Sequence, residues 1–238
     1  MSQTRRESLL QRLSTTKPDG RKRCWVFECP DPPGNASGDG LGRFCRRHLE
    51  HLRRHGDPIK RSYEATRLTP YRKSAGAWLK KNQIDRHVVQ TLKRVDGLML
   101  KAGSVIPPRN LRGVPVAGKA RAVWARLRDR ERKSDQVAAT ILGVAMCYQA
   151  DPQKGKLEYL QVQIAKVLNR MAGGEVKRWP TNHSDPSLPK ERVLRWFPAS
   201  EGLVLRQLGK EALTAVGYLV DGRMDDLLTF HRQRPESK

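Results

Sequence analysis

The chain has 238 residues, and 47 lysines and arginines against 24 aspartates and glutamates give it a formal net charge of +23 at pH 7. A balance this basic predicts a polyanionic partner, usually nucleic acid, and it excludes an acidic mimic of DNA. Four cysteines are too few for a disulfide scaffold. The sequence has no apolar run of 18 residues and no secretory signal, so it favours a cytoplasmic protein that does not bind membranes.

The N-terminal region, residues 1–19, is expected to form a short helix over about 4–13 and an arm. Residues 20–60 then contain three cysteines and a histidine spaced as C-x4-C, a 15-residue gap, and C-x2-H. Three thiolates and one imidazole complete a tetrahedral site around Zn²⁺ and leave no position for a substrate. We therefore expect a structural zinc ion around which a small, loop-rich segment can fold. The predicted ligands are Cys24, Cys29, Cys45 and His48.

The second pair of ligands opens a predicted helix, and the loop before it is rich in Pro, Gly, Asn and Asp. Cys45 and His48 lie one helical turn apart, on the same side of that helix, while the first pair supplies a facing knuckle. This arrangement is typical of a treble-clef-like finger. His51 and His55 are rival candidates for the fourth ligand, and small buried cysteines with a surface histidine are the alternative to a metal site.

The string CRRHLEHLRRHGDP, which follows CWVFEC, resembles a small zinc finger of phage and mobile-element proteins that often accompanies HNH homing endonucleases. The resemblance covers residues 24–58. It implies the same four ligands and a DNA-facing surface, to which we add three flanking residues. That surface comprises Arg43, Arg46, Arg47, Arg53, Arg54, His55, Lys60 and Arg61.

No HNH catalytic core can be recognised downstream of the finger. Such a core needs a general-base histidine and further ligands for a catalytic metal. After His55 only His87, His183 and His231 remain, in unrelated contexts. We therefore assign no catalytic residue.

After the finger the chain is predicted to be mainly α-helical. Residues 61–115 are expected to be a helical connector, and residues 116–238 a helical domain with a β-hairpin at about 175–197. Ser134 is a candidate cap for the second helix of that domain. The predicted helices are 85–102, 117–133, 135–150, 156–172, a long one from 200 and a short one around 224–231.

Three helices followed by a hairpin have the order of a winged-helix domain, in which the third helix, 156–172, would enter the major groove. A generic helical bundle is the alternative. Trp124, Trp179 and Trp196 are expected to pack in the core or against the hairpin, and Cys147 is expected to be a small buried hydrophobe. The apolar stripe of residues 201–220 is either core closure or a surface for a protein partner.

Basic residues are dense in this part of the chain, and residues 101–133 hold ten lysines and arginines against two acidic residues. Such a stripe predicts contacts with phosphates that depend strongly on salt. The predicted contacts are Lys119, Arg121, Arg126, Arg128, Arg130, Arg132, Lys166 and Arg170.

The sequence thus favours a non-enzymatic, zinc-containing DNA-binding protein of phage or mobile-element type. One alternative is a diverged endonuclease or recombination accessory enzyme. Another is an RNA-binding or ribonucleoprotein factor, because backbone contacts alone do not distinguish the two polymers. A third is an inhibitor of a host protein that acts through the C-terminal helix.

Overall fold

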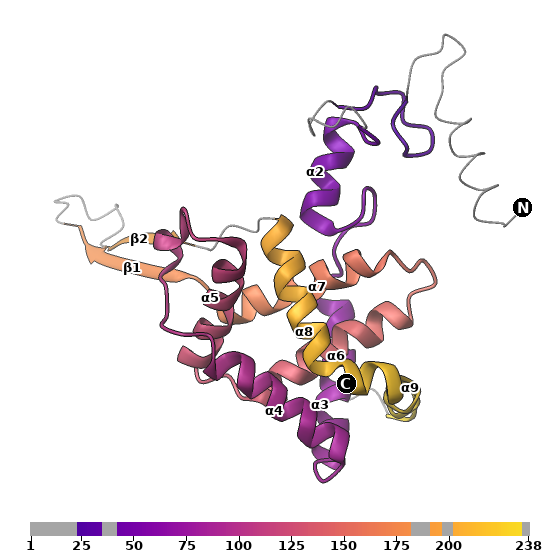
Figure 1. The fold of residues 1–238 in the computed structure, drawn as a ribbon, viewed down its shortest axis with the longest axis vertical. Helices are drawn as coiled ribbons and strands as arrows, with labels where there is room; N and C mark the ends of the chain where they lie inside the picture. Colours follow the sequence, from indigo (N-terminus) through magenta and orange to yellow (C-terminus); the bar gives the residue numbers. More distant parts are fainter. Residues whose placement is uncertain (1–22, 35–41, 182–190, 197–201, 235–238) are drawn as a thin grey trace, which may run out of the picture. The chain divides into compact units, whose positions relative to one another are not determined.

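The computed structural model describes residues 23–34, 42–181, 191–196 and 202–234, and the helix expected over 4–13 lies outside these ranges. The chain divides into two compact units, which we call the N-terminal unit (Met1–Ser62) and the helical body (Tyr63–Lys238). The fold is mainly α-helical, with one small antiparallel sheet, as predicted (Figure 1). No helix in the described ranges has both the length and the apolar composition that a bilayer crossing requires.

The N-terminal unit is organised around one helix, α2 (Arg46–His55), which begins after Cys45 and ends at Gly56. Gly56 has a φ of 79°, a left-handed conformation that glycine adopts without strain and that ends the helix. Among the described residues of this unit, the buried cluster consists of three cysteines, with Val26 and Phe44 packed against it as partly buried apolar side chains. Apolar burial among these residues is therefore very small.

The helical body contains seven α-helices among its described residues, and six of them match the predicted ones closely, whereas the range of α3 (Ala65–Lys81) was not predicted. The observed and predicted bounds differ notably at two helix ends. Ser134 is the first residue of its helix and does not cap it, because the N-cap position belongs to Lys133. The elements are α3 (Ala65–Lys81), α4 (Arg86–Leu100), the 3-10 helix η1 (Pro108–Leu111), α5 (Val116–Asp129), α6 (Ser134–Gln149), α7 (Leu157–Ala172), α8 (Gly202–Gly222) and α9 (Met224–Gln233).

Helix α5 ends at Asp129, four residues before the predicted end. Glu131 has a φ of 53°, in the left-handed region, and the N–H of Arg132 donates to the carbonyl of Leu127 as the chain turns. Arg130 and Arg132 therefore lie beyond the helix and do not continue its basic face.

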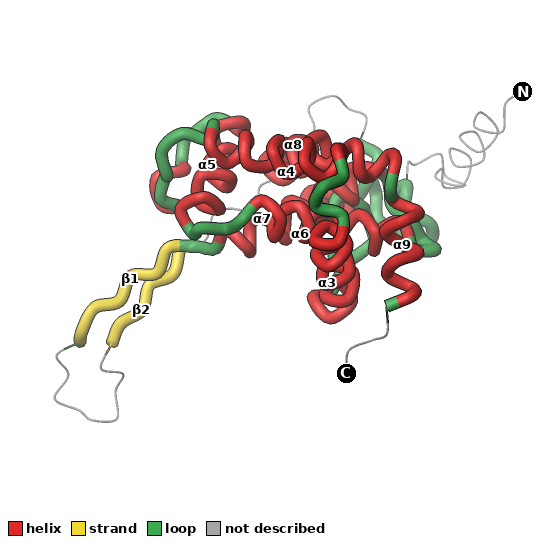
Figure 2. Tube along the Cα trace, turned by 90° about the horizontal axis from the view of Figure 1, so that it is seen from below, coloured by secondary structure: helices red, strands yellow, loops and turns green. Residues whose placement is uncertain are grey.

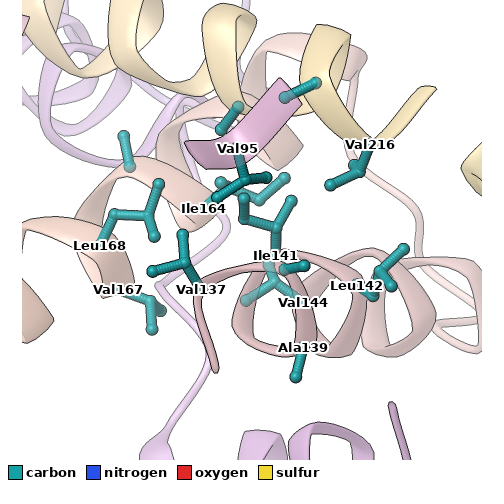
Figure 3. Packing of buried hydrophobic residues seen from close by; sticks show 14 of the residues in the cluster. Val95, Val137, Ala139, Ile141, Leu142, Val144, Ile164, Val167, Leu168 and Val216 are labelled. Atoms are coloured by element: carbon teal, nitrogen blue, oxygen red, sulfur yellow. The ribbon is translucent and has the colours of Figure 1, made fainter. Parts of the chain in front are cut away.

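The core of the body is built around α6, eleven of whose residues are buried. Figure 3 shows Val95 of α4, Ile164 and Leu168 of α7 and Val216 of α8 gathered near Ile141 of α6. Helix α3 packs along α6 as well. The segment predicted as a connector is thus an integral part of the body.

Helix α7, the predicted recognition helix of a winged-helix domain, lies inside the bundle. It packs against α5, α6 and α8. Gln163 of α7 is buried and accepts a hydrogen bond from the backbone N–H of Tyr63 at 3.3 Å. A recognition helix must expose one face to the major groove. The arrangement is therefore a helical bundle.

The apolar stripe of residues 201–220 is largely core closure. Leu205, Leu208, Val216 and Leu219 on α8 are buried against the rest of the body. Trp124 and Cys147 are fully buried, as predicted.

The predicted hairpin is present, with β1 (Glu175–Pro180) antiparallel to β2 (Glu191–Trp196) in a register that pairs Glu175 with Trp196. It projects away from the helices (Figure 2). Both faces are exposed, so Trp179 does not pack as expected. Arg109 holds the base of the hairpin, 3.5 Å from Glu175 and 6.0 Å from the centre of the Trp196 ring.

Candidate metal centre and basic surfaces

The four predicted ligands converge in the N-terminal unit. The sulfurs of the three cysteines and a ring nitrogen of His48 all lie within 4.8 Å of one another, and all four residues are buried. His48 is the only buried residue of α2, where it follows Cys45 by one turn. The N–H of Trp25 donates to the carbonyl of Arg43 at 2.8 Å, which ties the knuckle to the segment before the helix.

The separations within the cluster fit a four-coordinate metal ion. Nδ1 of His48 lies 3.2 Å from Sγ of Cys45 and 3.4 Å from Sγ of Cys24, and Sγ of Cys29 lies 3.9 Å from Sγ of Cys45. A tetrahedron with metal–sulfur bonds of about 2.3 Å and metal–nitrogen bonds of about 2.1 Å has edges of roughly 3.6–3.8 Å. Cys24, Cys29, Cys45 and His48 are therefore able to hold a metal ion with Nδ1 as the histidine donor.

Burial shifts the pKa values of the two kinds of ligand in opposite directions. It lowers the pKa of His48, with help from the charge of Arg47, and this favours the neutral imidazole that can bind a metal. Burial raises the pKa of Cys29 to about 11, so this thiol keeps its proton until a metal displaces it. Metal and protons thus compete for the same sulfur.

The two rival histidines, His51 and His55, make their contacts outside the ligand cluster. Nδ1 of His51 lies 2.8 Å from the carbonyl oxygen of Asp57, and Nδ1 of His55 lies 3.0 Å from Oγ of Ser62. The two rings stack on each other with centroids 4.3 Å apart. His48 is therefore the histidine of the cluster.

No family model matches the chain, and comparison with curated proteins and with solved structures gives no match either. The resemblance of residues 24–58 to phage and mobile-element fingers thus rests on its motif alone.

The opposite side of α2 is strongly basic. Its four arginines, Arg46, Arg47, Arg53 and Arg54, are all exposed. Arg46 forms an ion pair with Glu50 at 3.4 Å. Of the other predicted contacts in this unit, Arg43 and Arg61 are exposed, whereas His55 and Lys60 are half-buried. Helix α2 therefore joins a metal ligand on its inner face to a row of arginines on its outer face.

The predicted contacts of the helical body do not form one surface. Arg126 is buried, which corrects its expected position on a basic face. Arg128 donates to the carbonyls of Met99, Leu100 and Gly103 at the end of α4, and Arg130 donates to that of Gly174. The guanidinium groups of Arg128 and Arg130 therefore stabilise the fold. The exposure of the remaining residues differs, with Arg121, Arg132 and Arg170 exposed and Lys119 and Lys166 half-buried.

A basic groove that the sequence did not reveal lies between α4, α5 and α8. Of its cationic residues only Arg121 was among the predicted contacts. Three of its other cations belong to α4 and its end, but the fourth lies more than a hundred residues later on α8, so no single local pattern contains them all. The cations that line the groove are Lys93, Arg94, Lys101, Arg121 and Lys210.

Proposed function

We propose that the protein is a zinc-containing nucleic-acid-binding protein that uses α2 to contact the phosphate backbone of duplex DNA. The observation that carries the proposal is the two-sided character of α2, with His48 in the ligand cluster and four arginines exposed on the outside. Metal binding at the inner face would fix the helix and thereby the positions of its arginines.

Zinc is favoured by the donor set. Three thiolates and one imidazole form a closed structural site that suits a tetrahedral ion without redox chemistry. A closed site leaves no position for a substrate, so the metal would stabilise the unit and take no part in a reaction. The arginines would supply the affinity, because a guanidinium pairs with phosphate through two parallel hydrogen bonds.

DNA is proposed over RNA because residues 24–58 resemble fingers of mobile-element proteins. The outer face of α2 is also a single convex helix, a shape that can reach a duplex backbone without requiring unpaired bases. Competition between duplex DNA, single-stranded DNA and structured RNA at one salt concentration would separate these polymers.

The test is binding of the full chain to labelled duplex DNA, measured by fluorescence anisotropy. We choose Arg47→Gln together with Arg54→Gln, because both side chains are exposed and neither forms an ion pair within the described part of the chain. The affinity should fall at least about tenfold at 0.1 M salt, and the slope of log K against log salt should become shallower by about 2.

The matched control is Lys73→Gln together with Lys80→Gln on α3, where both lysines are exposed. It removes the same charge outside α2 and should change the affinity by no more than about threefold, since charges that do not contact the phosphates are screened by salt. Equal losses in the two double variants would contradict the proposal. Supercoiled plasmid incubated with the protein and Mg²⁺ should stay intact, and nicking would favour the endonuclease alternative instead.

A further inference from the structure

The groove between α4, α5 and α8 concentrates positive charge on the helical body. The three helices pack against one another, and the groove between them has a volume of about 760 Å³. Lys93, Arg94 and Lys101 line it from α4 and its end, Arg121 from α5 and Lys210 from α8. Figure 2 shows α4 and α8 lying close to each other, with α5 towards the hairpin end.

Four of these cations are without a side-chain partner among the described residues. The side chains of Lys93, Lys101, Arg121 and Lys210 form no ion pair or hydrogen bond there. Like charges that converge in this way repel one another, and a bound anion relieves the repulsion. The groove is therefore built to receive a ligand with several negative charges.

The single carboxylate that lines the groove is already engaged. Glu211 accepts a hydrogen bond from Nε1 of Trp124 at 2.8 Å through one oxygen, and from Nε2 of Gln207 at 2.7 Å through the other. Because Trp124 is fully buried, this network holds the carboxylate in place. One carboxylate offsets only part of the charge of the five cations.

An exposed aromatic ring lies beside the groove. Tyr218 on α8 is 48% exposed, and the guanidinium of Arg94 lies 4.2 Å from the centre of its ring. An aromatic ring next to a row of cations is the arrangement by which proteins bind unpaired bases together with their backbone. A furrow between directly packed helices is also too narrow to admit a duplex, whereas a single strand can lie along it.

We propose that this groove binds the backbone of a single-stranded nucleic acid, with a base stacked on Tyr218. The inference rests on the proposed function in that the ligand is again nucleic acid. It adds a second site, on different helices, for a different form of the polymer. A protein with both sites would recognise duplex DNA next to an unpaired strand.

The first test uses the full chain and a labelled oligothymidine. Lys101→Gln together with Lys210→Gln should weaken binding on the order of tenfold or more at 0.1 M salt and reduce the salt slope by about 1.4, since each phosphate contact on a single strand contributes about 0.7. The α3 pair, Lys73→Gln with Lys80→Gln, is the control and should bind like the wild type. Equal effects of the two pairs would overturn the proposal.

The second test addresses stacking. Tyr218→Leu should weaken oligothymidine binding by about fivefold or more, and Tyr218→Phe should keep it, because the ring and not the hydroxyl is used. If Leu and Phe behaved alike, the stacking role would be refuted. Inorganic polyphosphate is the competitor in a final experiment. If it displaced oligothymidine and Tyr218→Leu had no effect on binding, the groove would be a polyphosphate site and the proposal would be wrong.

The two proposals can fail separately. Groove variants are expected to leave duplex binding nearly unchanged, and the Arg47→Gln, Arg54→Gln variant is expected to leave oligothymidine binding nearly unchanged. The groove proposal fails if the groove variants keep oligothymidine binding, and the role of α2 fails if Arg47→Gln with Arg54→Gln keeps duplex binding. Circular dichroism of each variant verifies that the helices are intact.

Discussion

The N-terminal unit and the helical body achieve order in opposite ways. The body buries a continuous apolar cluster contributed by α3 to α9, with Trp124, Ile141 and Leu168 fully enclosed. The buried cluster of the N-terminal unit is three cysteines beside His48. Burial of that size cannot offset the entropy of ordering the chain. We therefore expect the body to fold by hydrophobic burial, and the described part of the N-terminal unit to depend on a bound metal ion.

Metal removal should therefore unfold the N-terminal unit and leave the helical body folded, and this is the largest expected effect. Binding of zinc to small Cys/His units is worth about 10–16 kcal/mol, so Cys45→Ser or a strong chelator should unfold α2. The body should keep its thermal transition. Metal content by mass spectrometry should fall by about one ion per chain, and protease cleavage after the arginines of α2 should become rapid.

Cys147→Ala is the matched control for this experiment, because Cys147 is also buried but belongs to α6 of the helical body and is not one of the four cluster residues. It should retain the metal while lowering the melting temperature of the body. A Cys45→Ser protein that kept stoichiometric metal would contradict the ligand assignment.

Close packing of the body can be broken without touching the metal. A Cβ added at Gly209 of α8 would overlap the carbonyl oxygen of Gln161 in α7. Gly209→Ala should force the two helices apart and destabilise the body by about 3 kcal/mol or more in urea titrations.

Gly217 provides the control on the same helix. A Cβ there would meet nothing closer than 3.9 Å, so Gly217→Ala should be neutral or stabilise by up to about 1 kcal/mol through helix propensity. Similar losses in both variants would mean that α7 and α8 do not pack this closely. Neither variant should change the metal content.

Different sequence signals predicted the two units. Ligand spacing placed the cluster correctly, since Cys45 and His48 are tied by one helical turn. Apolar periodicity placed helices such as α7, where Leu160, Ile164 and Leu168 recur at helical spacing and are buried. Both signals are local, and each reflects a single element.

What the sequence could not predict depends on residues that are distant in the chain. The hydroxyl of Tyr63 donates to Oδ2 of Asp151 at 2.8 Å, across 88 positions, and this buried pair joins the start of α3 to the end of α6. The basic groove likewise needs three helices. Arg126 was misplaced because a basic residue beside an apolar stripe gives no sign that a neighbouring element covers it.

Arg126 is a charged side chain that is buried in the helical body. None of its guanidinium nitrogens has a hydrogen-bond partner within the described ranges. Burial, with the nearby charge of Arg130, lowers its pKa to about 10. Replacing a buried, uncompensated charge with an apolar side chain of similar length removes the desolvation cost, so Arg126→Met should stabilise the body by about 1–3 kcal/mol.

Arg121→Met on the same helix is the control, because Arg121 is exposed and its loss should change the stability by less than about 0.5 kcal/mol. Chemical denaturation of both variants decides the matter. Arg126→Met should also leave duplex binding unchanged. Destabilisation by this substitution would mean that the guanidinium has a counterion.

The smallest expected effect concerns the start of α4. Oδ1 of Asp85 accepts hydrogen bonds from the N–H groups of His87 at 2.7 Å and Val88 at 3.3 Å, and Arg223 lies 3.3 Å from Oδ2. Asp85→Ala should cost about 1 kcal/mol, the usual value of an N-cap. Asp85→Asn keeps an acceptor for the two amides and should lose less, since only the charge of the pair is removed.

The dependence of this contribution on pH follows from the same contacts. Partial burial raises the pKa of Asp85, but the two N–H donors and the charge of Arg223 outweigh it, so the pKa lies below its ordinary value. A carboxylate with a depressed pKa stabilises the fold above its unfolded pKa of about 4, and this stabilisation is lost as the pH falls through the folded pKa. The advantage of the wild type over Asp85→Asn in urea titrations should therefore be constant near neutrality and shrink below about pH 4. An advantage that grew on acidification would show that the carboxylate is not held by these contacts.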